Sequence, residues 1–501
     1  MKPGTNQAYA ELEQRFRRWS ALRDAAGMLH WDMAAMMPEG GHGARAEQLA
    51  ALGVVGHQML SDPRNGDLLK DAAAKDGLGD WQRANLAEMR RLYIHATALD
   101  ERLVEAMSKA NSAAEAAWRV ARPAGDFAAV KPKLEIVFDL VREAAHAKAE
   151  KLGVSPYEAL MDEHEPGNRT ADIDVIFDNY GAFLPDFLAR VLERQDREPA
   201  PIQPKGPFPV DAQRALGERV MKTIGFDFNH GRLDTSLHPI CGGGPDDVRV
   251  TTRYTEEQVV TALMGIIHET GHAMYERGLP VDWRFQPVGN ARGMALHESQ
   301  SLLVEMQASR GADFCAYLSP LLNEVFPGNE AAFAPDNLRR LYSRVSRGFI
   351  RVDADEVTYP AHVILRYRLE QALIADDLKV ADIPAAWNEG MKELLGIVPP
   401  SDREGCLQDI HWFDGGIGYF PCYSLGAMTA AQLYEAACRA DPEIPAAIGR
   451  GDFKPLMAWL RPNVHERGSS MTTAEIVTAA TGRPLDVEVF KTHLKRRYLP
   501  N

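Results

Sequence analysis

The sequence predicts a mainly α-helical protein that contains one small β-sheet. Apolar side chains recur at helical spacing through most of the chain, whereas one short segment, Val248–Tyr254, alternates apolar and polar residues as a strand does. Because a strand of this length needs partners, we expect a small sheet within the helical protein. The composition, 45% hydrophobic and 25% charged over 501 residues, is that of an ordinary globular protein with a sizeable core.

The first 198 residues are expected to be helical and to carry no site of their own. Residues 7–29 place apolar side chains three to six positions apart, which makes a rough stripe on one helix face. The members of this stripe are Leu12, Phe16, Trp19, Leu22 and Met28. Four further segments, rich in Ala, Leu, Glu and Arg, show a similar periodicity: 43–60, 80–120, 128–150 and 171–195.

Five prolines crowd the segment 199–209: Pro199, Pro201, Pro204, Pro207 and Pro209. Each fixes φ and removes a hydrogen-bond donor, which predicts a loop. We interpret this loop as an internal connection, so that residues 1–501 form a single domain. The recognisable chemistry of this domain lies in the region 230–425.

The overall composition disfavours several classes of protein. A formal net charge of −14, spread along a chain without a nucleic-acid motif, argues against nucleic-acid binding. Five scattered cysteines without a C-x-x-C pair indicate neither a disulfide framework nor a thiolate zinc site. The chain lacks a run of about 18 apolar residues that would span a membrane, and the N-terminus lacks the apolar core of a signal peptide. We therefore expect a cytoplasmic protein without a membrane partner.

A helix is predicted directly after the strand. Thr255-Glu256-Glu257-Gln258 fits a capping box, in which Thr255 caps the helix and Gln258 reaches back to the cap. The helix should run from about residue 256 to 277 and end at Gly278, with Pro280 just beyond. It contains the motif His268-Glu269-Thr270-Gly271-His272.

This His-Glu-x-x-His motif predicts a divalent metal ion at the helix. His268 and His272 are four residues apart and face the same way, so both imidazoles can bind one ion. Glu269 points about 100° away from His268. It is therefore placed to take a proton from a water molecule at an open position of the ion. The alternative is that both histidines are ordinary helix residues in contact with solvent or the core.

A third ligand must come from elsewhere in the chain. The extended pattern H-E-x-x-H-x-x-G-x-x-H fails, because the glycine and the last histidine are both absent. Residues 295–305 predict a second helix that can turn back against the first. Within it Glu298 is the first choice, Glu305 on the same face is the second and His297 is the third. For each, the alternative is a solvated helix residue.

Together these motifs resemble the carboxypeptidase Taq family, also called thermostable carboxypeptidase 1, of H-E-x-x-H metallocarboxypeptidases. Further segments fit family elements in the same order: Leu29-His30-Trp31-Asp32, Met37-Pro38-Glu39-Gly40-Gly41, Asp247-Val248-Arg249-Val250-Thr251, His297-Glu298-Ser299-Gln300-Ser301, Ile350-Arg351-Val352-Asp353-Ala354-Asp355-Glu356 and Gly405-Cys406-Leu407-Gln408-Asp409-Ile410-His411-Trp412. The resemblance spans most of the chain. One departure is visible, because the family usually carries H-P-F where this chain has His238-Pro239-Ile240. The smaller Ile240 can reshape the adjoining pocket.

The resemblance implies a large, nearly all-helical, saddle-like fold with a long substrate groove, similar to neurolysin and thimet oligopeptidase. It also implies a homodimer, one zinc or cobalt ion per chain, and removal of single residues from peptides that end in a free carboxylate. By matching position, His268, His272 and Glu298 become the metal ligands and Glu269 the general base.

A C-terminal exopeptidase must recognise a carboxylate, which the donor fork of arginine does well. Arg351, in the I-R-x-x-A-D-E element, is the predicted anchor. The alternative is a structural ion pair with an acidic residue of the same element. Arg249 is the second candidate, since on the strand it can line the groove floor or block its far end. His238 is a further candidate for substrate contact, although a lone histidine before proline is more often structural.

The stretch 411–423 contains several glycines and is predicted to be a loop facing the groove. Twelve residues separate His411 from Tyr423, a spacing similar to that of a His and a Tyr in the neurolysin-like enzymes. We predict that Tyr423 stabilises negative charge on the attacked carbonyl oxygen, and that His411 assists it or contacts the substrate. Tyr419 and Phe420 are expected to pack the loop.

Two other functions compete with a zinc-dependent carboxypeptidase. An endopeptidase or oligopeptidase would use the same groove and metal, and a C-terminally amidated peptide distinguishes it. A scaffold with a structural metal would need four protein ligands. The sequence offers three, with a glutamate beside them.

Overall fold

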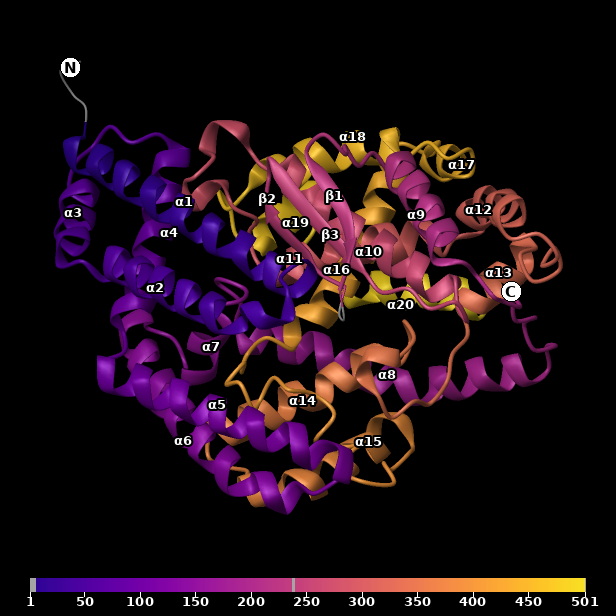
Figure 1. The fold of residues 1–501 in the computed structure, drawn as a ribbon, viewed down its shortest axis with the longest axis horizontal. Coiled ribbons are helices and arrows are strands. Elements are labelled where there is room, and N and C mark those ends of the chain that lie inside the picture. The colour runs from indigo at the N-terminus through magenta and orange to yellow at the C-terminus, as the bar shows by residue number, and fades with distance from the viewer. Residues whose placement is uncertain (1–5, 237–238, 501) are drawn as a thin grey trace.

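The computed structural model describes residues 6–236 and 239–500 and is mainly helical with one three-stranded sheet (Figure 1). The first half contains α1 (Gln7–Ala35), α2 (His42–Ser61), α3 (Pro63–Ala73), α4 (Asp80–Thr97), α5 (Glu101–Ala124), α6 (Phe127–Leu152), α7 (Pro156–Met161) and α8 (Thr170–Asp196). The predicted segment 80–120 divides into α4 and α5. The division follows from Asp100, whose side chain accepts a hydrogen bond from the Leu103 amide and caps α5.

The proline-rich segment 199–209 connects α8 to α9 (Val210–Ile224) without regular structure. Two asparagines hold its backbone. The amide of Ile202 donates to Oδ1 of Asn337 at 2.8 Å, and the amide of Lys205 donates to Oδ1 of Asn329 at 2.7 Å. These side-chain contacts replace the backbone partners that a loop lacks.

The sheet has the order β1-β3-β2, with β1 (Gly231–Thr235) parallel and β2 (Cys241–Gly244) antiparallel to β3 (Asp247–Thr252). The alternation expected for β3 holds at its start, since Val248 and Val250 are buried and Arg249 is partly exposed. It fails at Thr251, which is also buried, and the strand ends at Thr252 and not at Tyr254 as predicted. The buried valines share a core cluster with Leu233 of β1 and Ile266 of α10 (Val260–Gly278). Figure 1 shows the sheet in front of α10. The sheet therefore supports the helix that carries the His-Glu-x-x-His motif.

Helix α10 ends at Gly278 as predicted but begins at Val260, so the predicted start near residue 256 was wrong. The expected capping box does not form. Instead, the carbonyls of Thr255 and Glu256 accept hydrogen bonds from the Gln213 side chain and the Phe208 amide. Because these tertiary contacts occupy the carbonyls that would start the helix, residues 255–258 form a turn.

Helix α11 (Met294–Leu302) continues as a π-helix over Leu303–Ser309, and α16 (Pro421–Ala440) packs against α11. Ala295 belongs to one of the two largest hydrophobic cores and the adjacent Leu296 to the other. Helix α11 thus lies between these cores. The remaining α-helices are α12 (Ala312–Val325), α13 (Pro335–Tyr342), α14 (Tyr359–Ile374), α15 (Ile383–Leu395), α17 (Ile444–Ile448), α18 (Lys454–Asn463), α19 (Thr473–Thr481) and α20 (Val487–Tyr498). Within the described ranges, each helix is too short or too polar to cross a bilayer.

Candidate metal centre

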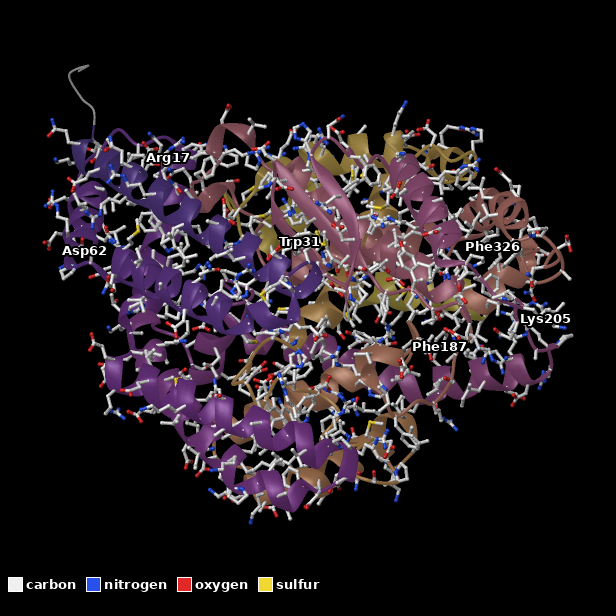
Figure 2. All side chains as sticks on the ribbon, viewed as in Figure 1. Arg17, Trp31, Asp62, Phe187, Lys205 and Phe326 are labelled. Atoms are coloured by element: carbon white, nitrogen blue, oxygen red, sulfur yellow. The ribbon has the colours of Figure 1, made fainter. Side chains whose placement is uncertain are left out.

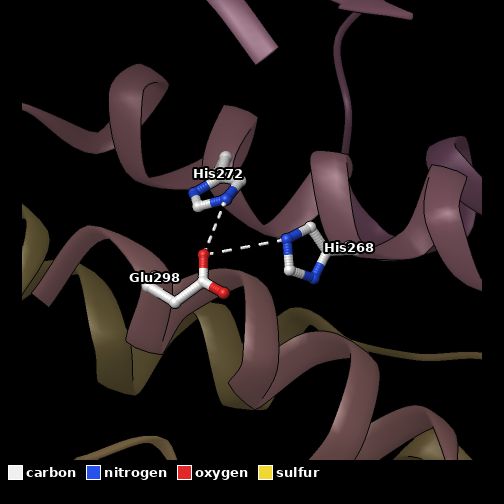
Figure 3. Close-up of side chains that lie close together, drawn as sticks. All are labelled: His268, His272 and Glu298. Atoms are coloured by element: carbon white, nitrogen blue, oxygen red, sulfur yellow. Dashed lines mark ion pairs between the residues drawn. The ribbon is translucent and has the colours of Figure 1, made fainter. Parts of the chain in front are cut away.

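Two histidines of α10 and a glutamate of α11 converge at one point (Figure 3). The carboxylate Oε2 of Glu298 lies 3.3 Å from Nε2 of His272 and 3.8 Å from Nε2 of His268. One donor atom from each of these side chains lies within 4.8 Å of the other two. These are the residues that the sequence and the resemblance singled out as metal ligands.

Two glycines allow α10 and α16 to pack closely against α11. A Cβ at Gly271 would lie only 2.6 Å from the backbone carbonyl oxygen of Gln300 and from Cα of Ser301, both on α11. A Cβ at Gly426 on α16 would lie 2.9 Å from Cβ and Cγ of Glu298. Backbone thus packs on backbone around the three side chains, which fixes Glu298 relative to α10.

The outer nitrogen of each histidine has its own partner. Nδ1 of His268 lies 2.9 Å from Oε2 of Glu305, which also accepts a 2.5 Å hydrogen bond from Arg310 through its other oxygen. Nδ1 of His272 lies 2.6 Å from Nδ1 of His297. Glu305 and His297, the alternatives for the third ligand, therefore contact the ligand histidines from outside. The sequence did not reveal this role.

The donor chemistry fits a divalent cation. Two imidazole nitrogens and one carboxylate are ligands that zinc accepts, and several other divalent ions accept them too. The Nδ1 contacts leave both Nε2 atoms facing Glu298. Burial acts to raise the pKa of Glu298, but His268 and His272 outweigh it and hold the pKa at about 2. The carboxylate is therefore ionised and ready to bind a cation.

Glu269 lies next to His268 on α10 and is buried. Burial raises the pKa of this carboxyl to about 7, although the neighbouring His268 acts in the opposite direction. A carboxyl that titrates near neutral pH can both take and return a proton. Its position and its pKa suit the general base predicted from the sequence.

Arg351 belongs to a buried ion cluster that the sequence did not predict. Its Nε and Nη2 donate to Oδ1 of Asp409 at 3.1 and 2.8 Å, and its Nη1 donates to the hydroxyl of Tyr359 at 3.0 Å. Asp409 also accepts a 2.7 Å hydrogen bond from Nε of Arg366. The acidic residues near Arg351 in sequence have other partners: Asp355 accepts from Thr358, and Glu356 contacts His493 and Arg497.

This cluster has one positive charge in excess, because two guanidinium groups share a single carboxylate. Arg351 is only 5% exposed and Arg366 is fully buried. The guanidinium carbon of Arg351 lies 4.9 Å from the ring centroid of Tyr423, which provides a further favourable contact. A buried cationic excess of this kind favours an anion that can reach it.

His411 lies in the loop before α16 and Tyr423 in the first turn of α16, with ring centroids 6.5 Å apart. The predicted loop 411–423 therefore ends at Phe420, because α16 begins at Pro421. Burial raises the pKa of Tyr423 to about 12, which Arg351 partly opposes. Burial lowers the pKa of His411 to about 4, so this imidazole is neutral at pH 7. Tyr419 packs edge-on against His164 at 5.1 Å, and Phe420 is buried against His411 at 4.5 Å.

Arg249 lies on β3. It donates to Asp247 at 2.8 Å, and its guanidinium carbon lies 4.4 Å from the ring centroid of Trp31. Trp31 belongs to α1 and is labelled in Figure 2. His238 lies outside the described residues. Ile240 directly precedes β2 and contacts β3: its amide donates to the Thr251 hydroxyl at 3.0 Å, and its carbonyl accepts from the Thr251 amide at 2.9 Å.

Open space borders two of the three converging side chains and, separately, His297. A cavity of about 210 Å³ is lined by His268, Glu298 and Tyr359. A second cavity, of about 600 Å³, is lined by His297 and Glu276 together with residues of α1 and of the turn between β2 and β3. The smaller cavity thus gives access to two of the predicted metal ligands, and the larger one reaches His297, which contacts the third.

The helical fold and the partly buried His, His, Glu set beside Glu269 define a metal-dependent peptidase. Comparison with known proteins gives its family. The model for the carboxypeptidase Taq (M32) metallopeptidase family matches residues 11–498, so the chain belongs to this family. It is a metal-dependent carboxypeptidase.

Relatives match over nearly the whole chain. Thermostable carboxypeptidase 1 of Thermus thermophilus is 35% identical over 507 residues, which cover 98% of each chain. The solved structure of metallocarboxypeptidase 1 of Trypanosoma cruzi is 42% identical, with a TM-score of 0.97 over 99% of this chain and 100% of that one. The carboxypeptidase of Pyrococcus furiosus gives a TM-score of 0.94 at 31% identity over 99% of both chains. These matches confirm the predicted fold class.

Proposed function

We propose that this carboxypeptidase releases single amino acids from the C-termini of peptides that end in a free carboxylate. The buried cluster of Arg351, Asp409 and Arg366 carries this proposal, because its excess positive charge suits one carboxylate. Tyr359 connects this cluster to the metal-binding side chains. It accepts a hydrogen bond from Arg351 and lines the cavity that borders His268 and Glu298.

His268, His272 and Glu298 are proposed to hold one divalent ion, with zinc as the expected metal and cobalt as the alternative. When bound, the ion polarises the scissile carbonyl and favours attack by water. The three side chains supply two imidazole donors and one ionised carboxylate, which support this assignment.

Each remaining side chain has a proposed role in the reaction. Arg351 anchors the C-terminal carboxylate of the peptide. Glu269 takes the proton of the attacking water and passes it to the leaving amine, for which a pKa of about 7 is suitable. Tyr423 donates a hydrogen bond to the oxygen that becomes negative, and His411 assists it. Arg249 contacts the substrate farther along the groove.

His238 is proposed to contact the substrate as well, and it lies outside the described residues. We further propose that residues 1–501 form one metallocarboxypeptidase domain, that two copies form a homodimer, and that the protein works in the cytoplasm. The five cysteines are free, which agrees with a reducing compartment.

A peptide and its C-terminally amidated form test the proposal directly. A hydrogen bond to a charged group contributes about 1.5–3 kcal/mol, so the free acid should be cleaved roughly 10- to 100-fold faster. Arg351→Lys should lose most of this preference, because lysine lacks the fork that matches two oxygens. Arg347→Lys, an exposed arginine of the same segment, is the matched control and should keep it. Equal cleavage of acid and amide by the unaltered enzyme would instead indicate an oligopeptidase.

A further inference from the structure

We propose that His297 and Glu276 form a positioning relay that sets which nitrogen of His272 is free to bind the metal. Nδ1 of His297 lies 2.6 Å from Nδ1 of His272, and Nε2 of His297 lies 2.8 Å from Oε1 of Glu276. The rings of His272 and His297 lie 4.6 Å apart, and Tyr275 lies 5.3 Å from His297 on the α10 side. His297 is therefore held between two rings with both nitrogens engaged.

The contact between His297 and Glu276 determines which nitrogen atoms of His297 and His272 carry protons. A carboxylate only accepts hydrogen bonds, so Nε2 of His297 must carry a proton and donate it to Glu276. In a neutral imidazole the other nitrogen is then an acceptor, which leaves Nδ1 of His297 without a proton. Because two Nδ1 atoms at 2.6 Å need one proton between them, His272 must supply it.

With its proton on Nδ1, His272 has a bare Nε2. This is the nitrogen that lies 3.3 Å from Oε2 of Glu298. The lone pair required for a metal bond thus points at the metal-binding carboxylate. Glu276 determines this arrangement without touching the ligand, since it acts through His297.

The two ligand histidines are oriented in different ways. His268 has a carboxylate on its Nδ1, and Glu305 is itself fixed by Arg310. That carboxylate accepts only, so the tautomer of His268 is set by a single contact. His272 faces an imidazole, which can donate or accept through the same atom. Glu276 removes this ambiguity through His297, so the orientation of His272 depends on a more distant side chain than that of His268 does.

One continuous helix supplies both orienting partners and the third ligand. His297 directly precedes Glu298, and Glu305 follows it by seven residues in the π-helix. Glu276 belongs to α10 and lies at the wall of the cavity of about 600 Å³. The relay therefore runs from the metal-facing nitrogen of His272 to a side chain that is reachable from this cavity.

Zinc affinity of Glu276 variants tests the relay. Glu276→Gln keeps an oxygen acceptor for Nε2 of His297, whereas Glu276→Leu removes it at similar size. Affinity is measured by competition with a chromogenic chelator, and the visible absorption bands of the cobalt-loaded protein report the ligand field. We expect Glu276→Gln to bind zinc within about threefold of the unaltered protein. Glu276→Leu should bind roughly 10- to 100-fold more weakly and shift the cobalt bands.

Controls separate the relay from folding and from the proposed function. Thermal midpoints of the metal-free proteins show whether each variant folds, and Glu276→Met replaces Glu276→Leu if that variant does not. Unchanged zinc affinity and cobalt bands in the variant without an acceptor would overturn the relay, as would an equal loss in Glu276→Gln. An unaltered protein that binds no zinc or cobalt would instead contradict the metal site on which the relay depends.

Discussion

Gly271→Ala tests whether close packing of α10 on α11 holds the metal site together. Gly271 lies between the two histidines in sequence, and its added Cβ would meet the carbonyl oxygen of Gln300 and Cα of Ser301 at 2.6 Å. Both contacts are with backbone, so no side-chain rotation relieves them. Ordinary contact begins at 3.4 Å, and the helices must therefore separate by about 0.8 Å.

A separation of this size affects metal binding more than folding. Overpacking costs about 1–3 kcal/mol, of which replacement of a helical glycine returns about 1 kcal/mol. The variant should therefore fold with a slightly lower thermal midpoint. Glu298 moves with α11, however, and metal–ligand distances tolerate only about 0.2 Å. We expect zinc affinity to fall at least roughly tenfold.

Gly265→Ala is the matched control, because it lies on the same helix and its added Cβ would meet, among the described residues, only the Thr252 hydroxyl at 3.9 Å. This variant should keep zinc affinity and gain up to about 1 kcal/mol of stability. Zinc is titrated against a chelator, and unfolding is followed by calorimetry in metal-free buffer. Equal zinc affinity in Gly271→Ala and Gly265→Ala would refute the reasoning.

Three further changes have defined outcomes. Glu269→Gln should keep its bound metal and lose most turnover, and a metal-loaded variant with normal activity would exclude Glu269 as the base. Asp409→Ala should cost about 3–5 kcal/mol, because it leaves Arg351 and Arg366 buried without a partner; an unchanged thermal midpoint would contradict this. His465→Gln should reduce acid sensitivity. Burial lowers the pKa of His465 to about 3, so the unfolded chain binds the extra proton below pH 6.5. The free energy of unfolding then falls by about 2 kcal/mol between pH 6.5 and 5. If the thermal midpoint of the variant fell as much over this range as that of the unaltered protein, His465 would be excluded as the cause.

Local sequence patterns were sufficient for most of the long helices of the first half and for the start of β3. Long amphipathic segments such as 128–150 and 171–195 bury one face in a shared core. Their apolar residues therefore recur at helical spacing, which the sequence shows directly. The glycine-rich β2 has no such pattern, because its strand conformation comes from pairing with β3. The start of α10 was missed for a related reason, since residues near Phe208 and Gln213 occupy the carbonyls of Thr255 and Glu256.

The candidate site was partly visible in the sequence. The spacing of His268 and His272 predicts their convergence, and the resemblance selected Glu298 from three alternatives. The partners of these residues were not visible, because they depend on tertiary contacts. Asp409 is 58 positions from Arg351, and Glu305 reaches Nδ1 of His268 from within a π-helix. Local spacing does not predict such contacts.

Anomalous diffraction at the zinc absorption edge, from crystals of the zinc-loaded protein, tests the metal centre most directly. We predict one strong peak per chain, within bonding distance of Nε2 of His268, Nε2 of His272 and a carboxylate oxygen of Glu298, with one coordination position left open to solvent. A peak elsewhere, or a fourth side chain that closes that position, would contradict it.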